Sequence, residues 1–533
     1  MRFLSHLLKV IEQKQEEKPG FASHSSLPST HHRWERLTRM WLGIFAGPRM
    51  AELTFLIVGL TGLAGCSGDQ KPQKDILAMP PRLTVVVLED AQLAQTLRSY
   101  EGQWQAETGS QLEVNLSPAP PAPLEKAQEA PGTKADVLVF RSAQLGQLAE
   151  AGQILPMTED RLTPYIAAWT DLVEPLRDQE GRWGQQVYGL SLGSPVLVCY
   201  CRQDLLDRLG VAPPRTWEEY RQVAQQLKDR SRLVWPELSK DRPWAPALEP
   251  LAVGWAGWLL LARAASYAKH PNYYSTLFEM QSMQPRIAEP PFVRALEELA
   301  ATAKLADSPE VLLECDPDRV RERFWQGECG LALGWPSRAG PEKAAPGIKC
   351  TIVPIPGSST LWHPGEQKWL SASKGEVFRT PLLGISGRWA AIGAGSAHPE
   401  AALQLIFWLA DKQGSEPRPA VCSATAVFRK SDLKDLKRLQ SWVEPAMPPE
   451  TAQQYAQALQ QTFSSHQWLV ALRIPGWQEY LAALDEAVHA AVQGKQSAQQ
   501  ALRQAAQKWQ AITARFGLER QRQAYRRNLG LPD

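Results

Sequence analysis

The chain has 533 residues, of which 44% are hydrophobic and 21% charged, a balance typical of a folded globular protein. Its formal net charge of +2 excludes the strongly basic surface that nucleic-acid binding requires. The 9 histidines and 7 cysteines show no zinc-site spacing, so the sequence predicts neither a metal nor a cofactor. Tryptophan, with 20 residues, is unusually frequent.

A short apolar run, LTFLIVGLTGLA over residues 53–64, follows several arginines near the N-terminus. It has the length of a signal-peptide core and is too short to span a bilayer, which takes roughly 20 apolar residues. Residues 63–66, LAGC, resemble the lipobox of bacterial lipoproteins, in which the cysteine is acylated after cleavage before it. We expect a signal peptide with a long n-region over residues 1–65, lipidation at Cys66 and a membrane-anchored linker over residues 66–82. An ordinary secretory signal that contains a cysteine is the alternative.

Roughly 465 residues follow Cys66, more than one hydrophobic core usually supports. Three apolar and β-branched runs predict buried strands, over residues 83–88, 112–116 and 135–140. Helical patterns follow the first and third runs, and the second is followed by a proline-rich stretch, residues 117–132. This order predicts an α/β fold with a mostly parallel sheet.

Ligands on such sheets bind outside the carboxyl ends of the strands. Four polar residues come directly after the first and third predicted strands and are candidate ligand-binding residues: Glu89, Asp90, Arg141 and Ser142. We therefore expect these side chains near the binding site.

Further along the chain, the run PVLVCYC predicts a strand over residues 195–201, and a capping box at Thr216 and Glu219 predicts a helix start. Strands are expected over residues 329–334 and 349–355, with a loop over 357–374. Two of the remaining predicted helices begin at Pro399 and Ser497, and the apolar spacing of Tyr480, Leu484, Val488 and Val492 marks another.

Five stretches, in order, resemble one family: ADVLVFRSAQLGQLAEAGQILPM, YGLSLGSPVLVCYCRQDLLDRLGVAPPRTWEEY, FWQGECGLALGWPS, AIGAGSAHPEAALQLIFWLA and RIPGWQEYLAALDEAVHAAVQGK. The family is the extracellular solute-binding proteins, family 1, which are similar to maltose-binding protein. In this chain Arg202-Gln203-Asp204 replaces the usual Asn-Lys-Asp of the second stretch.

The resemblance implies a two-lobed periplasmic-binding-protein fold of type II, maltose-binding-like, with the ligand in the cleft between α/β lobes. The expected N-terminal lobe comprises residues 83–190 and 356–430, and the expected C-terminal lobe comprises residues 191–355 and 431–533. Hinge strands would join the lobes, with Tyr188, Gly189, Ser191 and Pro354 as hinge residues.

The resemblance also implies a function. The protein would be an extracytoplasmic lipoprotein that captures a small solute and delivers it to the membrane subunits of an ABC permease, without catalysis and as a monomer. A sugar or oligosaccharide is the favoured solute, because aromatic rings stack on the apolar faces of sugars. The family also takes up polyamines, metals and phosphodiesters, so this choice rests on the excess of tryptophan.

Five tryptophans are candidates for the cleft: Trp255, Trp258, Trp335, Trp389 and Trp477. Trp335 follows a predicted strand at the Trp-bearing position of the family, and Trp389 lies in a segment where the family's loop faces the cleft. Arg388 and Tyr480, which lie beside two of these tryptophans in sequence, complete the expected ligand-binding set. Core packing is the alternative for each tryptophan.

Two other functions compete with solute delivery. A ligand-sensing receptor module would bind the same solute without transporting it. A secreted hydrolase or glycosidase would need catalytic residues, and the segment Gly189–Gly193 matches G-x-S-x-G, the nucleophile elbow. A strand rather than a helix is predicted after Ser191, and Glu89 and Asp90 are adjacent in one loop, so neither feature favours an enzyme.

Overall fold

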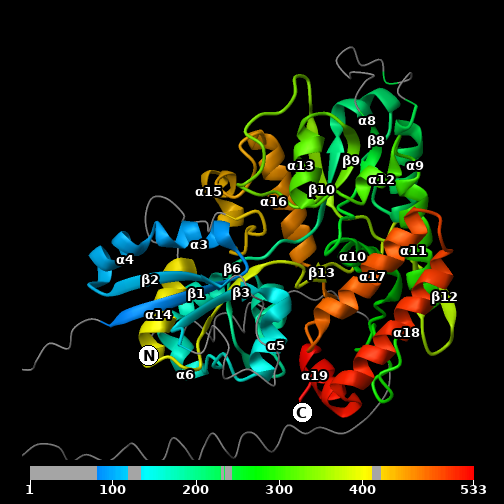
Figure 1. Cartoon of the computed structure of the whole chain (residues 1–533). Coiled ribbons are helices and arrows are strands. Elements are labelled where there is room, and N and C mark those ends of the chain that lie inside the picture. The colour runs from blue at the N-terminus through cyan, green and yellow to red at the C-terminus, as the bar shows by residue number, and fades with distance from the viewer. Residues whose placement is uncertain (1–80, 118–133, 230–232, 234–242, 411–421, 533) are drawn as a thin grey trace, which may run out of the picture. The chain divides into compact units, whose positions relative to one another are not determined.

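The computed structural model describes residues 81–117, 134–229, 233, 243–410 and 422–532 (Figure 1). The predicted signal peptide, Cys66 and the proline-rich stretch lie outside the described residues. Within the described ranges, no helix combines the length and apolar character that crossing a bilayer would take.

The first lobe is built on a five-stranded sheet of order β2-β1-β3-β14-β6. The strands are β1 (Arg82–Leu88), β2 (Gln111–Ser117), β3 (Val137–Arg141), β6 (Leu190–Gly193) and β14 (Arg388–Ile392). β1 pairs in parallel with both β2 and β3, as the sequence predicted, and two helices between β1 and β2 form the crossover that a parallel pair requires. β14 is antiparallel to β3 and to β6, so the complete sheet is mixed.

Helices of the first lobe cover this sheet, and α19 at the C-terminus of the chain contacts α5 and β4. A short hairpin, β4 (Arg182–Trp183) with β5 (Gln186–Val187), belongs to the same lobe. The helices are α3 (Ala91–Arg98), α4 (Glu101–Thr108), α5 (Leu145–Glu150), α6 (Glu159–Leu162), α7 (Ile166–Asp171) and α14 (Pro399–Ala410). α19 (Leu518–Asn528) belongs to the segment 431–533, which we expected in the C-terminal lobe, and it packs against the first lobe from there.

The second lobe contains a four-stranded sheet of order β10-β7-β9-β8. Its strands are β7 (Val198–Arg202), β8 (Ala245–Leu248), β9 (Cys329–Gly334) and β10 (Cys350–Pro354). Its helices are α8 (Gln203–Leu209), α9 (Trp217–Leu227), α10 (Ala256–Ala268), α11 (Pro290–Ala303), α12 (Pro309–Leu312), α13 (Pro317–Trp325), α15 (Leu436–Gln440), α16 (Pro449–Phe463), α17 (Trp477–Val492) and α18 (Ala498–Phe516).

Helix ends follow the chemistry read from the sequence. The Thr216 side chain accepts a hydrogen bond from the Glu219 amide, and the Glu219 carboxylate accepts one from the Thr216 amide. The predicted capping box therefore begins α9. Ser497 and Gln500 form the same arrangement at α18. The helix expected before Gly109 is broken into α3 and α4, and Gly109 ends α4 with φ 74°, a left-handed conformation that favours glycine.

The prediction of a loop over residues 357–374 is wrong in one respect, because part of this segment forms a hairpin of β11 (Thr360–His363) and β12 (Lys368–Ser371). Trp362 and Trp369 are direct partners across the hairpin, with ring centroids 5.3 Å apart, and such aromatic pairs stabilise antiparallel strands. The hairpin contacts α10, a helix of the second lobe, although we assigned residues 356–430 to the first.

The chain passes between the sheets in several short segments. Residues 194–197 join β6 to β7, and residues 384–387 join β13 (Leu382–Leu383) to β14. β13 pairs with β15 (Leu469–Val470), just before the chain enters α17. The candidate site lies beside the second of these segments, because Ile385 and Ser386 line the same cavity as Arg141 at the end of β3 and Trp477 at the start of α17.

Candidate functional site

A cavity of about 290 Å³ combines residues from both lobes. Its lining is mainly apolar and aromatic, with a few polar side chains, as in small-molecule sites generally. The lining residues are Arg141, Val253, Gly254, Trp255, Trp258, Ile385, Ser386, Trp477, Gln478, Leu481, Ala482 and Asp485. Four residues that the sequence made candidates for the ligand site are among them: Arg141, Trp255, Trp258 and Trp477.

Three tryptophans form the aromatic wall of this cavity: Trp255, Trp258 and Trp477. Trp255 occupies the N-cap position of α10, and Trp477 is the first residue of α17. The rings of Trp258 and Trp477 stack at an interplanar angle of 25° with centroids 6.3 Å apart. The two helices approach closely because α10 carries Gly257, where an added Cβ would lie 2.8 Å from Leu481 and Leu484.

Asp485 fixes the start of α10. Its carboxylate accepts hydrogen bonds from the backbone amides of Gly254 at 2.6 Å and Gly257 at 2.7 Å. The first amides of a helix have no partner within the helix, so this carboxylate on α17 satisfies one donor of α10, Gly257, and one donor just before the helix, Gly254. Burial raises the pKa of Asp485 above its ordinary value although both amide bonds favour the carboxylate. The contact holds Trp255 at the cavity.

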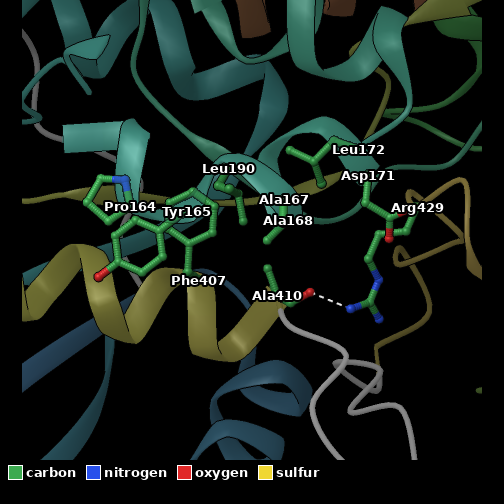
Figure 2. A pocket seen from close by; sticks show the side chains of 10 residues that line it. All are labelled: Pro164, Tyr165, Ala167, Ala168, Asp171, Leu172, Leu190, Phe407, Ala410 and Arg429. Carbon is green, nitrogen blue, oxygen red and sulfur yellow. Dashed lines mark hydrogen bonds between the residues drawn. The ribbon is translucent and has the colours of Figure 1, made fainter. Parts of the chain in front are cut away.

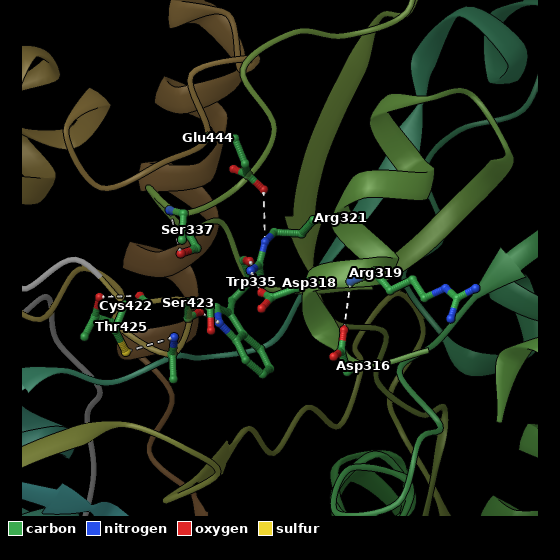
Figure 3. Close-up of polar contacts among 12 residues, drawn as sticks. Asp316, Asp318, Arg319, Arg321, Trp335, Ser337, Cys422, Ser423, Thr425 and Glu444 are labelled. Atoms are coloured by element: carbon green, nitrogen blue, oxygen red, sulfur yellow. Dashed lines mark hydrogen bonds and ion pairs between the residues drawn. The ribbon is translucent and has the colours of Figure 1, made fainter. Parts of the chain in front are cut away.

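Trp335 lies behind Trp255 instead of lining the cavity. The two ring centroids are 5.4 Å apart, and Trp335 is 1% exposed. Figure 3 shows its indole turned toward Ser423, whose carbonyl accepts the indole N–H at 3.0 Å. Arg321 donates to the Trp335 carbonyl at 3.3 Å. Trp335 is therefore placed to support Trp255, and the direct ligand contact predicted for it has no support from this position.

Arg141 supplies a cationic group to the cavity from the end of β3. Its Nε is buried, and within the described part of the chain no hydrogen-bond acceptor lies within reach of it. Burial lowers the pKa of Arg141, and the positive charge of Arg388 lowers it further. The guanidinium thus contributes a positive charge to the cavity lining.

Glu89, at the carboxyl end of β1, is half-buried and has φ 55°. A non-glycine residue in this left-handed region is uncommon and costs backbone strain. Its carboxylate accepts the side-chain amide of Gln144 at 2.6 Å, and its charge acts on Arg141. The predicted grouping of Glu89 with Arg141 at the strand ends is present.

Asp90 and Arg388 form a buried ion pair, with 2.6 Å between Nη2 and Oδ2. Asp90 also caps α3 by accepting the Leu93 amide at 2.9 Å. Its pKa is lowered by the charge of Arg388 and these hydrogen bonds, which outweigh the effect of burial. Both side chains are occupied within the protein, so the structure gives them a structural role where we expected ligand contact.

Three further predicted ligand residues lie away from the cavity because other elements cover them. Trp389 is 1% exposed, and its indole donates to Glu180 at 3.1 Å. Ser142 is fully buried beside it in the first lobe. The Tyr480 hydroxyl bonds to Thr513 at 2.8 Å, toward α18.

Two of the four expected hinge residues, Ser191 and Pro354, are held in strands. Ser191 pairs with Trp389 inside the first sheet, and Pro354 pairs with Val198 in the second. The first connection therefore lies at residues 194–197, beyond the expected segment around Tyr188 and Gly189. The Ser191 hydroxyl accepts the Gly193 amide at 3.1 Å, and strand β7 follows, so the strand–helix geometry of a nucleophile elbow is absent at this serine.

A second cavity, of about 440 Å³, lies entirely in the first lobe (Figure 2). Tyr165 and Phe407 stack on one side with centroids 4.2 Å apart, and Arg429 donates to the Ala410 carbonyl at 2.6 Å on the other. None of the residues predicted to bind ligand lines it. The smaller cavity is the better candidate because its residues come from both lobes and include predicted ligand residues.

Sequence reasoning missed Asp485, Ser386 and Leu481 as site residues. Trp477, Leu481 and Asp485 are spaced by four residues and so share one face of α17, which is the signal that could have found two of them. Within the described ranges, no group of three or more His, Cys, Asp or Glu side chains is arranged to hold a metal.

A family model described as bacterial extracellular solute-binding protein matches residues 103–418 of the chain. Solved structures share the fold at low identity. An ABC transporter solute-binding protein from Agrobacterium radiobacter K84, in complex with ribitol, is 18% identical with a TM-score of 0.59, covering 81% of this chain and 98% of its own.

Two further structures agree with this similarity. Maltose-bound MalE3 of T. maritima is 18% identical with a TM-score of 0.59, over 81% of this chain and 100% of its own. The cyclic alpha-maltosyl-1,6-maltose binding protein of Arthrobacter globiformis is 15% identical with a TM-score of 0.54, over 81% and 99%. The two-lobed type II fold predicted from the sequence is thereby confirmed.

Proposed function

Because the chain belongs to the bacterial extracellular solute-binding proteins, we propose that it captures a sugar or polyol outside the cytoplasm and delivers it to an ABC importer. The observation that carries the choice of solute is the cavity lined by Trp255, Trp258, Trp477 and Arg141. Aromatic rings stack on the C–H faces of a sugar, and a guanidinium donates hydrogen bonds to its hydroxyls. Ribitol and maltose bound to proteins of the same fold support this solute class.

Binding without catalysis suits the polar groups near the cavity. The Asp90 carboxylate is held by Arg388 with a lowered pKa, so it is a poor proton donor. Asp485, which lines the cavity, has both oxygens bound to backbone amides. A glycosidase would need one carboxylic acid and one carboxylate on opposite sides of the scissile bond. We propose a binding role for this set of residues.

The proposal is tested with ribitol, mannitol, maltose and longer maltooligosaccharides. We expect at least one of these solutes to give a binding signal in calorimetry and to raise the midpoint temperature of thermal unfolding. A solute at 100 times its Kd adds about 2.7 kcal/mol to the free energy of unfolding, because it binds only the folded protein. The bound solute should reduce the radius of gyration in small-angle scattering, because the lobes close around it. If no member of this panel gives heat or thermal stabilisation, the carbohydrate assignment is refuted.

We further propose that the mature protein is anchored by a lipid on Cys66. Cys66→Ser removes the thiol that is acylated, so the variant should appear in the soluble fraction and incorporate no labelled fatty acid. Ser67→Ala, next to it, is the matched control and should remain in the membrane fraction. Membrane retention of Cys66→Ser, together with an unlabelled wild type, would contradict the lipobox assignment.

A further inference from the structure

Glu180 is a fully buried carboxylate at the end of the segment Leu176–Glu180 of the first lobe. A buried carboxylate is costly unless hydrogen bonds and a compensating charge surround it. Both oxygens are within hydrogen-bond distance of the Ser194 hydroxyl, at 2.7 and 2.9 Å, and Oε1 also accepts the Trp389 indole N–H at 3.1 Å. Each partner lies in or beside a strand of the first sheet.

Arg473 supplies the compensating charge from the segment between β15 and α17. Its side chain is fully buried, and Nη1 donates to the Glu180 backbone carbonyl at 2.5 Å. Nε donates to Asn528 at 3.0 Å, at the end of α19. The carboxylate thus lies where the C-terminal part of the chain returns to the first lobe, and burial raises its pKa despite these partners.

Ser194 is the first residue of the connection from β6 to β7. Gly193, before it, has φ 136°, and a Cβ there would lie 2.7 Å from the Thr425 side chain. Gly387, in the second connection, is equally close, because its added Cβ would lie 2.4 Å from the Ser194 hydroxyl. Segments far apart in sequence therefore meet at Ser194 with no side-chain volume to spare.

We propose that Glu180 is a positioning residue for lobe closure, which ties the first connection to the first lobe through the Ser194 hydroxyl. This inference rests on the proposed function, in which the lobes close around a solute. Hinge motion is absorbed by a few residues at the ends of elements. Because Ser194 is tied, rotation is confined to the residues that follow it, and the bond biases the equilibrium between open and closed forms.

The test is a double-mutant cycle of Glu180→Gln and Ser194→Ala, read as a distance between the lobes. Spin labels are placed on cysteines introduced at the exposed positions Gln92 and Glu297, and pulsed dipolar spectroscopy is recorded without solute. We expect each single variant to broaden the distance distribution and to change the population of the minor form at least about threefold. Ser194→Ala removes the hydrogen bond, whereas Glu180→Gln weakens it by replacing a charged acceptor with a neutral amide oxygen. The double variant should therefore add nothing beyond Ser194→Ala, because Glu180 acts on the connection only through the Ser194 hydroxyl.

Glu444→Gln is the matched control. Glu444 is also a buried carboxylate that accepts a hydroxyl, from Tyr200 at 2.9 Å, but it lies within the second lobe. The Glu444→Gln variant should lower the stability of the protein and leave the distribution of distances between the lobes unchanged. If Glu180→Gln and Ser194→Ala behave like Glu444→Gln, the positioning role is overturned. Should Glu180→Gln fail to fold, Ser194→Ala alone decides, since it keeps the carboxylate.

The outcome for Glu180 is separable from that for the proposed function. The distances are measured without solute, so they report on the connection even if no saccharide binds. Failure of the solute panel with a shifted distribution would refute the solute class and keep the positioning role. If the wild type and both variants have the same distance distribution without solute, and a solute closes all three, the positioning role is refuted and the function is kept.

Discussion

Replacing Trp255 by alanine is expected to weaken solute binding about thirtyfold or more, which corresponds to about 2 kcal/mol for an aromatic at the centre of a site. Trp255 is the half-buried member of the aromatic wall, so one part of its ring faces the cavity while Trp335 covers another. Truncation would remove the stacking surface and leave a void in front of Trp335. Isothermal titration with the best-binding member of the saccharide panel measures the loss.

Trp369→Ala is the matched control for this measurement. Trp369 is also half-buried in the second lobe, but it packs against Tyr267 and Trp362 on the hairpin. Its truncation should leave the affinity within about twofold of wild type, as expected for a residue outside the interface. Wild-type affinity in Trp255→Ala would remove the cavity as the solute site.

The sequence was sufficient to place only some of the elements that carry this cavity: β3 and α17 were predicted, whereas no helix was predicted over α10 (Ala256–Ala268). A continuous apolar run such as residues 83–88 predicts a buried parallel strand, and β1 begins only one residue earlier, at Arg82. The polar residues after such strands lie at the carboxyl edge by topology, which is why Glu89 and Arg141 were found together. Trp477 lies in the stretch that resembles the closing helix of the family, and it is the first residue of α17.

The faces of individual tryptophans were harder to predict. Trp389 lies on strand β14, and the residues next to it in sequence do not indicate which face of that strand is exposed. Its environment is set by Glu180, 209 residues earlier in the chain, and by Gly181, which brings backbone against the ring. Periodicity within one element carries no information about a partner from another element, so burial of Trp389 and of Trp335 follows from tertiary packing alone.

The same limit explains the missed role of Asp485. An aspartate inside a helix pattern reads as a solvent-facing residue, since its intrinsic preference is for helix caps and surfaces. Here it does cap a helix, but one that begins at residue 256, more than 200 positions away in sequence. The aromatic wall therefore depends on a contact between α10 and α17 that only the fold supplies.

Trp104→Ala should have the opposite signature to Trp255→Ala: a large loss of stability with the affinity preserved. Trp104 is 1% exposed on α4 and packs edge-on against Trp408 with centroids 5.2 Å apart. Removing a fully buried tryptophan leaves a cavity in the first lobe and costs roughly 3–5 kcal/mol of unfolding free energy. Urea denaturation measures this loss, and titration of the folded fraction should give the wild-type Kd.

Trp408→Ala provides the comparison on the other side of the same contact. Trp408 is only half-buried, and its indole donates to Glu107 at 2.6 Å near the surface. Trp408 buries less apolar area on folding than Trp104 does, so its truncation should lower the free energy of unfolding by only about 1–2 kcal/mol. Equal losses of unfolding free energy for the two variants would contradict the assignment of this difference to burial. A weakened Kd in Trp104→Ala would mean that the first-lobe core and the solute site are coupled, and that tryptophans of this chain cannot be divided into those that bind and those that stabilise.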